Sequence, residues 1–151
     1  MKSFKYTLII LLLLSRNLKA QESTIPDIRN SKNYATGYLG MFEYNLNYER
    51  NLFQFHRSYS NIRTGFGQMN NLQASGYVYN LTLVHLLGRQ SSHLEINIGV
   101  KYIKVPANDA QSTFYPDLFL GYRFEKPDGN FIWRAGLSGL SLINVGAGLK
   151  F

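Results

Sequence analysis

Apolar and polar residues alternate along most of this chain, and this alternation constrains the fold more than any other feature. The clearest case is 142–151, which reads Leu-Ile-Asn-Val-Gly-Ala-Gly-Leu-Lys-Phe, with apolar side chains at the odd positions from Ile143 to Phe151. A period of two is typical of a β-strand, because successive side chains point to opposite faces. The segment ends on an aromatic residue of its apolar face, as expected where that face meets lipid.

Seven segments carry this pattern clearly: 41–50, 58–68, 77–87, 93–103, 114–124, 130–137 and 142–151. An eighth, 33–39, carries it weakly, and Val78 and Val84 blur the pattern of the third. Strands of about ten residues can cross a bilayer when tilted, and barrels of a single bacterial chain have an even strand number. The sequence therefore predicts an all-β fold: a closed antiparallel up-and-down transmembrane β-barrel of about eight strands. The connection 50–58 is longer than this scheme expects of a turn.

The first 20 residues have the order of a secretory signal peptide. Lys2 and Lys5 precede an apolar run over 8–14, and a small residue, Ala20, stands before Gln21. The apolar run is too short for a transmembrane helix, which needs about 20 residues. We therefore predict cleavage between Ala20 and Gln21, a polar lead-in over 21–32 and a barrel over 33–151. The alternative is an uncleaved membrane anchor.

Composition argues against two classes of protein, those that bind nucleic acid and those that disulfides stabilise. The chain carries a net charge of +7, but four of its basic residues lie in the leader, so 21–151 carries only +3 and gives no reason to expect nucleic-acid binding. Since the chain has no cysteine, an exported form cannot depend on disulfides for its stability.

The two faces of the predicted strands differ in chemistry. Girdle candidates on the apolar face are the aromatic residues Tyr38, Tyr44, Tyr48, Tyr77, Tyr79, Tyr102, Tyr122, Phe124, Phe131, Trp133 and Phe151. The other face is rich in glycine and predicts a luminal charge network of Glu43, Glu49, Arg63, Glu95, Lys101, Asp117, Arg123, Arg134 and Lys150. An eight-stranded barrel is narrow enough for side chains to fill it. Because unpaired buried charge is costly, we expect opposite charges to pair and to close the lumen.

Catalytic chemistry has one candidate region, formed by His85, Ser92, His93 and Glu95. Ser92 and His93 are adjacent in a strand and should point to opposite faces, which is a poor arrangement for a nucleophile and its base. With three histidines and no paired-ligand spacing, the chain gives no metal-site signal and no cofactor motif. We therefore assign no catalytic, cofactor-binding or metal-binding residue.

Four short motifs and their order resemble a family of short, mostly uncharacterised bacterial outer-membrane β-barrel proteins. They are Asn-Tyr-Glu-Arg at 47–50, Leu-Leu-Gly-Arg followed by His-Leu-Glu within 86–95, Gly-Tyr-Arg followed by a Pro-Asp-Gly turn within 121–129, and Arg-Ala-Gly at 134–136. The general class is similar to the small OmpA/OmpX-type barrels.

The resemblance implies a place in the bacterial outer membrane after Sec-type export, with membrane lipid as partner. It further implies that the outer-membrane assembly machinery recognises the last strand through Phe151. It implies no catalytic residue.

The most consistent interpretation is an outer-membrane barrel with a filled lumen and a structural or surface-interaction role. Three alternatives remain open from the sequence: a lipid-modifying outer-membrane enzyme, a narrow pore for small solutes, and a secreted soluble barrel that binds an apolar ligand. The last would invert the two faces, placing the apolar stripe inside.

Overall fold

Eight β-strands make up the computed structural model, which describes residues 32–151 apart from 56–57, 71–74, 90, 107–111 and 127. The predicted leader, its Ala20–Gln21 cleavage site and nearly all of the lead-in therefore lie outside the described residues. The strands are β1 (Asn33–Gly40), β2 (Glu43–Phe55), β3 (Ser58–Asn70), β4 (Ser75–Arg89), β5 (Ser92–Lys104), β6 (Thr113–Glu125), β7 (Phe131–Ser138) and β8 (Leu142–Lys150).

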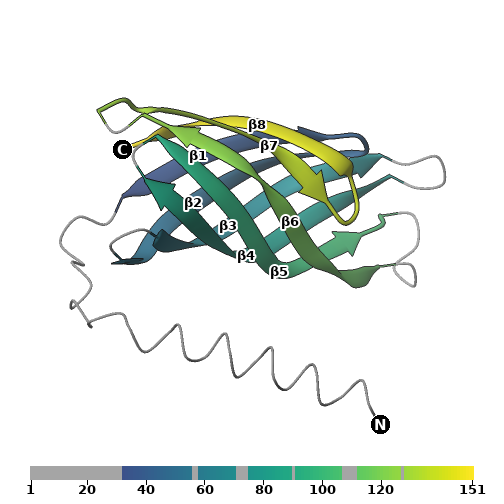
Figure 1. The fold of residues 1–151 in the computed structure, drawn as a ribbon. Coiled ribbons are helices and arrows are strands. Elements are labelled where there is room, and N and C mark those ends of the chain that lie inside the picture. The colour runs from purple at the N-terminus through teal and green to yellow at the C-terminus, as the bar shows by residue number, and fades with distance from the viewer. Residues whose placement is uncertain (1–31, 56–57, 71–74, 90, 107–111, 127) are drawn as a thin grey trace, which may run out of the picture.

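The sheet closes on itself. Each strand pairs antiparallel with its neighbours in sequence, and β1 pairs with β8 from Tyr34↔Lys150 to Gly40↔Asn144 (Figure 1). At the end of this seam, Asn33 and Phe151 each donate a backbone N–H to the other's carbonyl, at 3.0 Å. Closure pairs the backbone of β1 with that of β8, so neither strand is left as an unpaired edge at the seam. The predicted fold class is confirmed.

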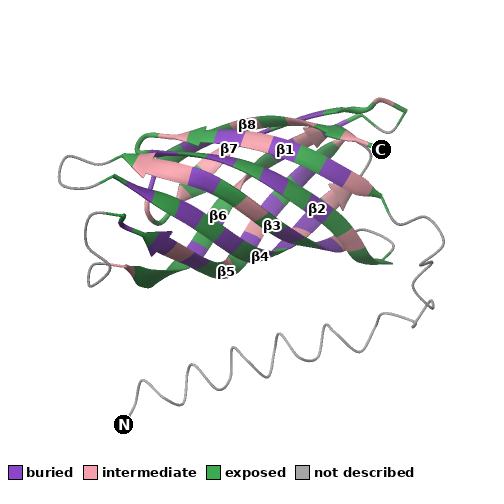
Figure 2. Ribbon diagram, turned by 180° about the vertical axis from the view of Figure 1, so that it is seen from behind, coloured by how far each residue is buried: buried purple, intermediate pink, exposed green. Residues whose placement is uncertain are grey.

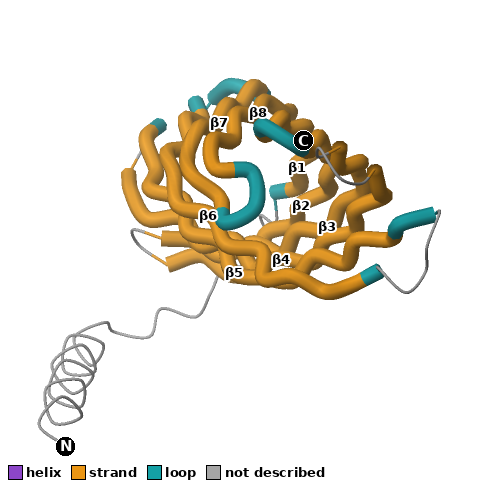
Figure 3. The backbone as a smooth tube through the Cα atoms, turned by 90° about the vertical axis from the view of Figure 1, so that its right-hand side faces the viewer, coloured by secondary structure: helices purple, strands orange, loops and turns teal. Residues whose placement is uncertain are grey.

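Both chain ends of the described barrel lie together, as a view toward one mouth makes clear (Figure 3). We call the end that carries Asn33 and Phe151 the terminal end, and the other the far end. The β2–β3, β4–β5 and β6–β7 connections lie at the terminal end, and the other four at the far end. No helix among the described residues is long and apolar enough to cross a bilayer.

Side chains alternate between the outside and the interior of the barrel, which gives the strands the banded pattern of Figure 2. The outer face is apolar: Leu46 is 72% exposed and Ile98 is 63% exposed. The inner face is polar, with Glu49, Glu95 and Arg123 fully buried. The inverted arrangement of a soluble ligand-binding barrel is therefore wrong for this chain.

Aromatic rings line the outer face in two groups. Toward the far end, Phe66, Tyr79, Tyr102 and Phe114 form a row across β3 to β6, with ring centroids 5.3, 6.4 and 4.9 Å apart. Toward the terminal end, Trp133 contacts Tyr122 at 5.5 Å and Phe124 at 6.1 Å. Such pairs at two heights match the aromatic girdles of membrane barrels.

Tyr38, predicted for a girdle, instead points into the lumen and is buried. The reason lies in β1, where Tyr34, Thr36 and Tyr38 share one face. Their hydroxyl groups suit the polar interior, and the small residues opposite them face outward. In this strand an aromatic side chain therefore does not mark the face that points outward.

The expected long connection at 50–58 is also wrong, because β2 continues to Phe55 and pairs there with Ser58. A β-bulge at Leu52 shifts the pairing, so that Asn51 faces Asn61 while Phe53 faces Ser60. The extra residue reverses the alternation, which keeps both Phe53 and Phe55 on the outer face. Because the alternation reverses at Leu52, a period-two pattern in the sequence does not extend to the end of β2.

Luminal glycines bring neighbouring strands close together. Gly121 and Gly136 are register partners on β6 and β7. A Cβ added to Gly136 would lie 2.5 Å from the Gly121 Cα and 2.7 Å from the Phe119 ring. Gly37 differs, because it faces outward and a Cβ there would meet nothing closer than 3.5 Å. A side chain would thus clash at the two inward-facing glycines but not at the outward-facing Gly37.

We predict that Gly136→Ala lowers the free energy of unfolding by about 1–3 kcal/mol, since the methyl group overpacks the contact with Gly121 and Phe119. The matched control Gly37→Ala should leave stability unchanged or slightly higher. Urea titrations of barrels folded in lipid vesicles measure both. Equal effects of the two substitutions would contradict the steric assignment.

We predict that deletion of Leu52 is tolerated, because it removes the bulge and leaves Phe53 and Phe55 facing outward in continuous register. Deletion of Leu46 is the control: one half of β2 would then turn its polar face to the outside. The shift in gel mobility between heated and unheated samples reports barrel formation. A folded Leu46 deletion, or an unfolded Leu52 deletion, would refute this account.

Candidate functional site: the charged lumen

The structure places the nine predicted network residues on the inner face of the barrel. Eight of them are buried, and Lys150 is partly buried at the terminal end. They form a central cluster around Glu49 and Glu95, a far-end cluster around Lys101 and, for Lys150, a terminal-end cluster. These three clusters are the candidate functional site.

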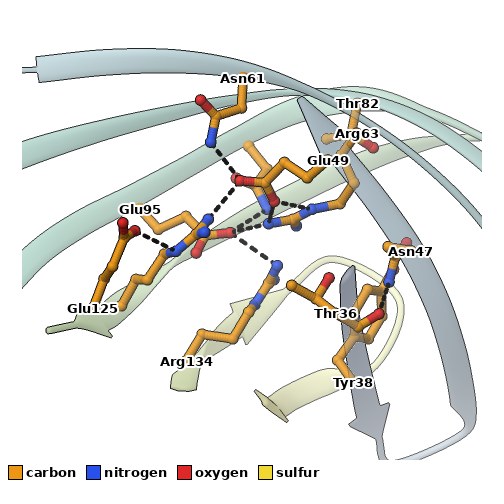
Figure 4. A network of polar contacts seen from close by, with 12 residues as sticks. Thr36, Tyr38, Asn47, Glu49, Asn61, Arg63, Thr82, Glu95, Glu125 and Arg134 are labelled. Carbon is orange, nitrogen blue, oxygen red and sulfur yellow. Dashed lines mark hydrogen bonds and ion pairs between the residues drawn. The ribbon is translucent and has the colours of Figure 1, made fainter. Parts of the chain in front are cut away.

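The central cluster holds two carboxylates between three guanidinium groups (Figure 4). Arg63 donates through Nε and Nη2 to Glu49 Oε2, at 2.8 and 2.6 Å. Arg123 Nη1 donates to Glu49 Oε1 at 2.6 Å, and Asn61 donates to the same oxygen. Arg63 Nη2 and Arg134 Nη1 both lie 2.9 Å from Glu95 Oε1. The contacts join β2, β3, β5, β6 and β7 across the interior.

Strand register explains how this cluster assembles. Glu49 and Arg63 are direct cross-strand partners, so the first pair forms locally. Arg123 and Arg134 also face each other directly, although both are cations. Their repulsion is offset because Arg123 contacts Glu49, which reaches it from β2 across the barrel, and Arg134 contacts Glu95 on β5. The contact between Glu49 and Arg123 needs a closed barrel. Buried ion pairs of this kind are very sensitive to loss of one partner.

The far-end cluster has the opposite charge balance. Lys101 Nζ donates to Glu43 Oε1 at 2.5 Å and lies 3.3 Å from Asp117 Oδ1. Thr82 donates its hydroxyl to the other oxygen of Asp117. One cation thus lies between two carboxylates, whereas the central cluster has three cations and two carboxylates. The positive excess of one cluster complements the negative excess of the other.

A layer of amides and one tyrosine separates the two clusters. Asn80 Nδ2 donates to Tyr38 Oη and to Asn47 Oδ1, each at 3.0 Å. The Tyr38 ring lies 6.0 Å from Lys101 Nζ and 5.1 Å from the Arg134 guanidinium carbon. Tyr38 therefore contacts a cation of each cluster, and cation–π attraction adds to its packing.

Glu125 is the important residue that the sequence interpretation missed. Tyr34 and Tyr59 donate their hydroxyls to its two oxygens, at 3.2 and 2.7 Å. Arg123 Nε lies 3.7 Å and Lys150 Nζ 3.6 Å from the same carboxylate. With Glu125, the described interior holds five carboxylates and five cations. Its spacing from Arg123 and Asp117 by even numbers is the available signal, but the predicted strand ends at residue 124, one residue before it.

The residues considered for catalysis lie apart. Ser92 is exposed on the outer face, with its hydroxyl 2.7 Å from that of Tyr122. His93 is buried inside, 5.3 Å from the Tyr59 ring. His85 Nδ1 lies 2.8 Å from the hydroxyl of Ser60, a serine that the sequence did not single out and that is only 2% exposed. Glu95 belongs to the central ion cluster.

The described residues contain no group of three or more His, Asp or Glu side chains that could hold a metal ion. The luminal carboxylates face arginine and lysine instead. The chemistry that the arrangement offers is therefore mutual neutralisation within a packed interior, with cross-barrel contacts that fix the distance between opposite walls.

Two solved structures share this fold. The N-terminal β-barrel domain of OprF from Pseudomonas aeruginosa superimposes with a TM-score of 0.55 and 13% identity, over 80% of this chain and 96% of that one. The outer-membrane protein Ail from Yersinia pestis, determined in a phospholipid bilayer nanodisc, gives 0.53 and 14%, over 80% and 99%. Both are eight-stranded outer-membrane barrels, so the expected class of small outer-membrane barrels is confirmed for the fold. The sequence itself matches no family model and no curated protein.

We predict that Glu49→Gln lowers the free energy of unfolding by about 3–5 kcal/mol, because it leaves two buried guanidinium groups without their shared carboxylate. Asp128→Asn, at an exposed turn, is the control and should change stability by less than about 0.5 kcal/mol. Urea-induced unfolding followed by Trp133 fluorescence gives both values. If Glu49→Gln were as stable as the wild type, the charge network would not be a main source of the barrel's stability.

Proposed function

We propose that this protein is an integral outer-membrane β-barrel with a closed lumen, which acts as a structural or surface-interaction protein and conducts no solutes. The observation that carries the proposal is the direction of the charges. All five acidic side chains of the described strands point inward and pair with basic ones. The outward band between the two aromatic groups has no charged residue among the described side chains.

The outer surface supports a membrane location. A lipid-facing band must be apolar, since hydrocarbon offers no hydrogen-bond partner, and a spanning sheet must close to satisfy its backbone. Apolar side chains of this band are each more than half exposed, among them Leu46, Leu81, Ile98 and Leu120. A continuous exposed apolar band of this kind would be unfavourable in water. A barrel in lipid has no such cost.

The lumen argues against a pore. Arg63 and Arg123 extend across the interior to carboxylates of other strands, and both are almost fully buried. Tyr38 and its amide partners occupy the level between the clusters. An ion crossing this interior would have to displace paired charges, which supports a lumen that does not conduct.

The serines argue against a lipid hydrolase. Ser60, the described serine in contact with a histidine, is buried and therefore closed to a substrate. Ser92 is accessible, but its hydroxyl contacts the hydroxyl of Tyr122, which is a weak base. A triad would need an accessible nucleophile, a base and an orienting group. We therefore propose a role without catalysis.

The last strand supports recognition during assembly. Phe151 is 68% exposed on the apolar side, while its backbone is paired with Asn33 across the seam. We propose that the outer-membrane assembly machinery binds this strand before the seam closes, and that the leader directs Sec-type export and is removed at Ala20–Gln21.

We predict that the mature chain, refolded into planar bilayers, produces no conductance steps, because paired charges fill its lumen. A general porin in the same bilayers is the positive control for insertion. Discrete steps that scale with the amount of wild-type protein would favour the narrow pore. A mature chain that stays soluble and monomeric without detergent would refute the membrane assignment.

A further inference from the structure

Charge is divided between the two faces of this barrel. The described acidic side chains are buried inside it, with the single exception of Asp128. Among the side chains that the structure describes, the exposed basic ones are those of Lys32, Arg50, Lys104 and Lys126. The accessible surface is therefore positive at its rims, although the interior is balanced.

Three of these exposed cations come two residues after an outward-facing aromatic residue. Arg50 comes two residues after Tyr48 on the outer face of β2, and Lys126 comes two residues after Phe124, just past the end of β6. Both stand at the terminal end. Lys104, two residues after Tyr102, is the counterpart at the far end. Aromatic rings lie at the boundary of the hydrocarbon, so the next position outward lies at the level of the lipid phosphates.

Two described carboxylates lie near this rim in the sequence, those of Glu125 and the exposed Asp128, and neither forms an ion pair with Arg50 or Lys126. Glu125 is buried, and its carboxylate already faces Arg123, Lys150 and two tyrosine hydroxyls. No described carboxylate lies within ion-pair distance of Arg50 or Lys126. Their charge is therefore available to a ligand from outside the barrel.

We propose that Arg50 and Lys126 bind the phosphates of anionic phospholipids in the leaflet that surrounds the terminal end. The inference rests on the proposed membrane location and adds the chemical class of lipid. Charge complementarity selects the occupant, because a net anionic headgroup gains from each nearby cation, whereas a zwitterionic headgroup brings its own ammonium group. Attraction of about 1 kcal/mol per basic residue corresponds to about fivefold enrichment.

The single tryptophan of the chain provides the reporter. Trp133 faces outward on β7 and stacks on Phe124, two residues before Lys126. The mature chain is reconstituted in phosphatidylcholine vesicles that contain phosphatidylglycerol, with bromine on the acyl chains of one lipid class at a time. Brominated phosphatidylglycerol should quench Trp133 as though enriched about fivefold over its mole fraction, and high salt should abolish the preference.

Lys126→Gln should bring this enrichment close to one. Lys104→Gln removes the same charge at the far end and should leave the quenching of Trp133 unchanged, so it is the matched control. For Arg50, the reporter is moved with Trp133→Phe and Tyr48→Trp, and Arg50→Gln is compared with Lys104→Gln in that background. All of these positions are exposed, so folding should be preserved.

The outcomes separate the two proposals. Quenching by both brominated lipids without preference for the anionic one would overturn the headgroup site and leave the membrane location supported. Quenching by neither lipid would overturn the membrane location itself. Equal loss of preference in Lys126→Gln and Lys104→Gln would also overturn the site, because it would indicate a general effect of net charge.

Discussion

Pairing of buried charges inside a closed sheet is the interaction on which the rest of this structure depends. Five carboxylates and five cations share the described interior, and the central ones have almost no contact with solvent. In such surroundings an unpaired charge would be very costly. The strands must therefore stay in the register that brings Glu49 to Arg63 and Glu95 to Arg134. Luminal Gly121 and Gly136 make room for the Phe119 ring, whose centroid lies 4.0 Å from the Arg134 guanidinium carbon.

The same network explains why the two faces can differ so strongly. With every acidic residue of the described strands directed inward, the outer wall is left to apolar and aromatic side chains and to a few cations at its rims. A sealed interior and a lipid-compatible exterior are thus two consequences of one charge distribution. They also support the proposed role, in which the rims and connections, rather than a channel, meet other molecules.

Much of the fold could be predicted because membrane strands repeat a simple rule. Strands such as 93–103 alternate without interruption, and their predicted bounds differ from β5 by one residue at each end. The rule failed where a strand breaks it. Leu52 inserts a bulge that reverses the alternation in β2, and Tyr38 places an aromatic ring on the polar side of β1. Tyr38 contacts Asn80 and Lys101 on distant strands, and the bulge changes the pairing of β2 with β3; a local pattern contains neither.

Sequence by itself determined the strand class, the number of strands and most of the residues that share the inner face, because a period of two follows from strand geometry alone. It also identified nine of the charged residues that the structure places inside. Only the tertiary structure decided their partners. Glu125 joins Tyr34, Tyr59 and Lys150 across the barrel. Arg123 tolerates Arg134 beside it because Glu49 reaches Arg123 from β2 and Glu95 contacts Arg134 from β5. Such contacts depend on closure, since only a closed sheet brings non-adjacent strands face to face.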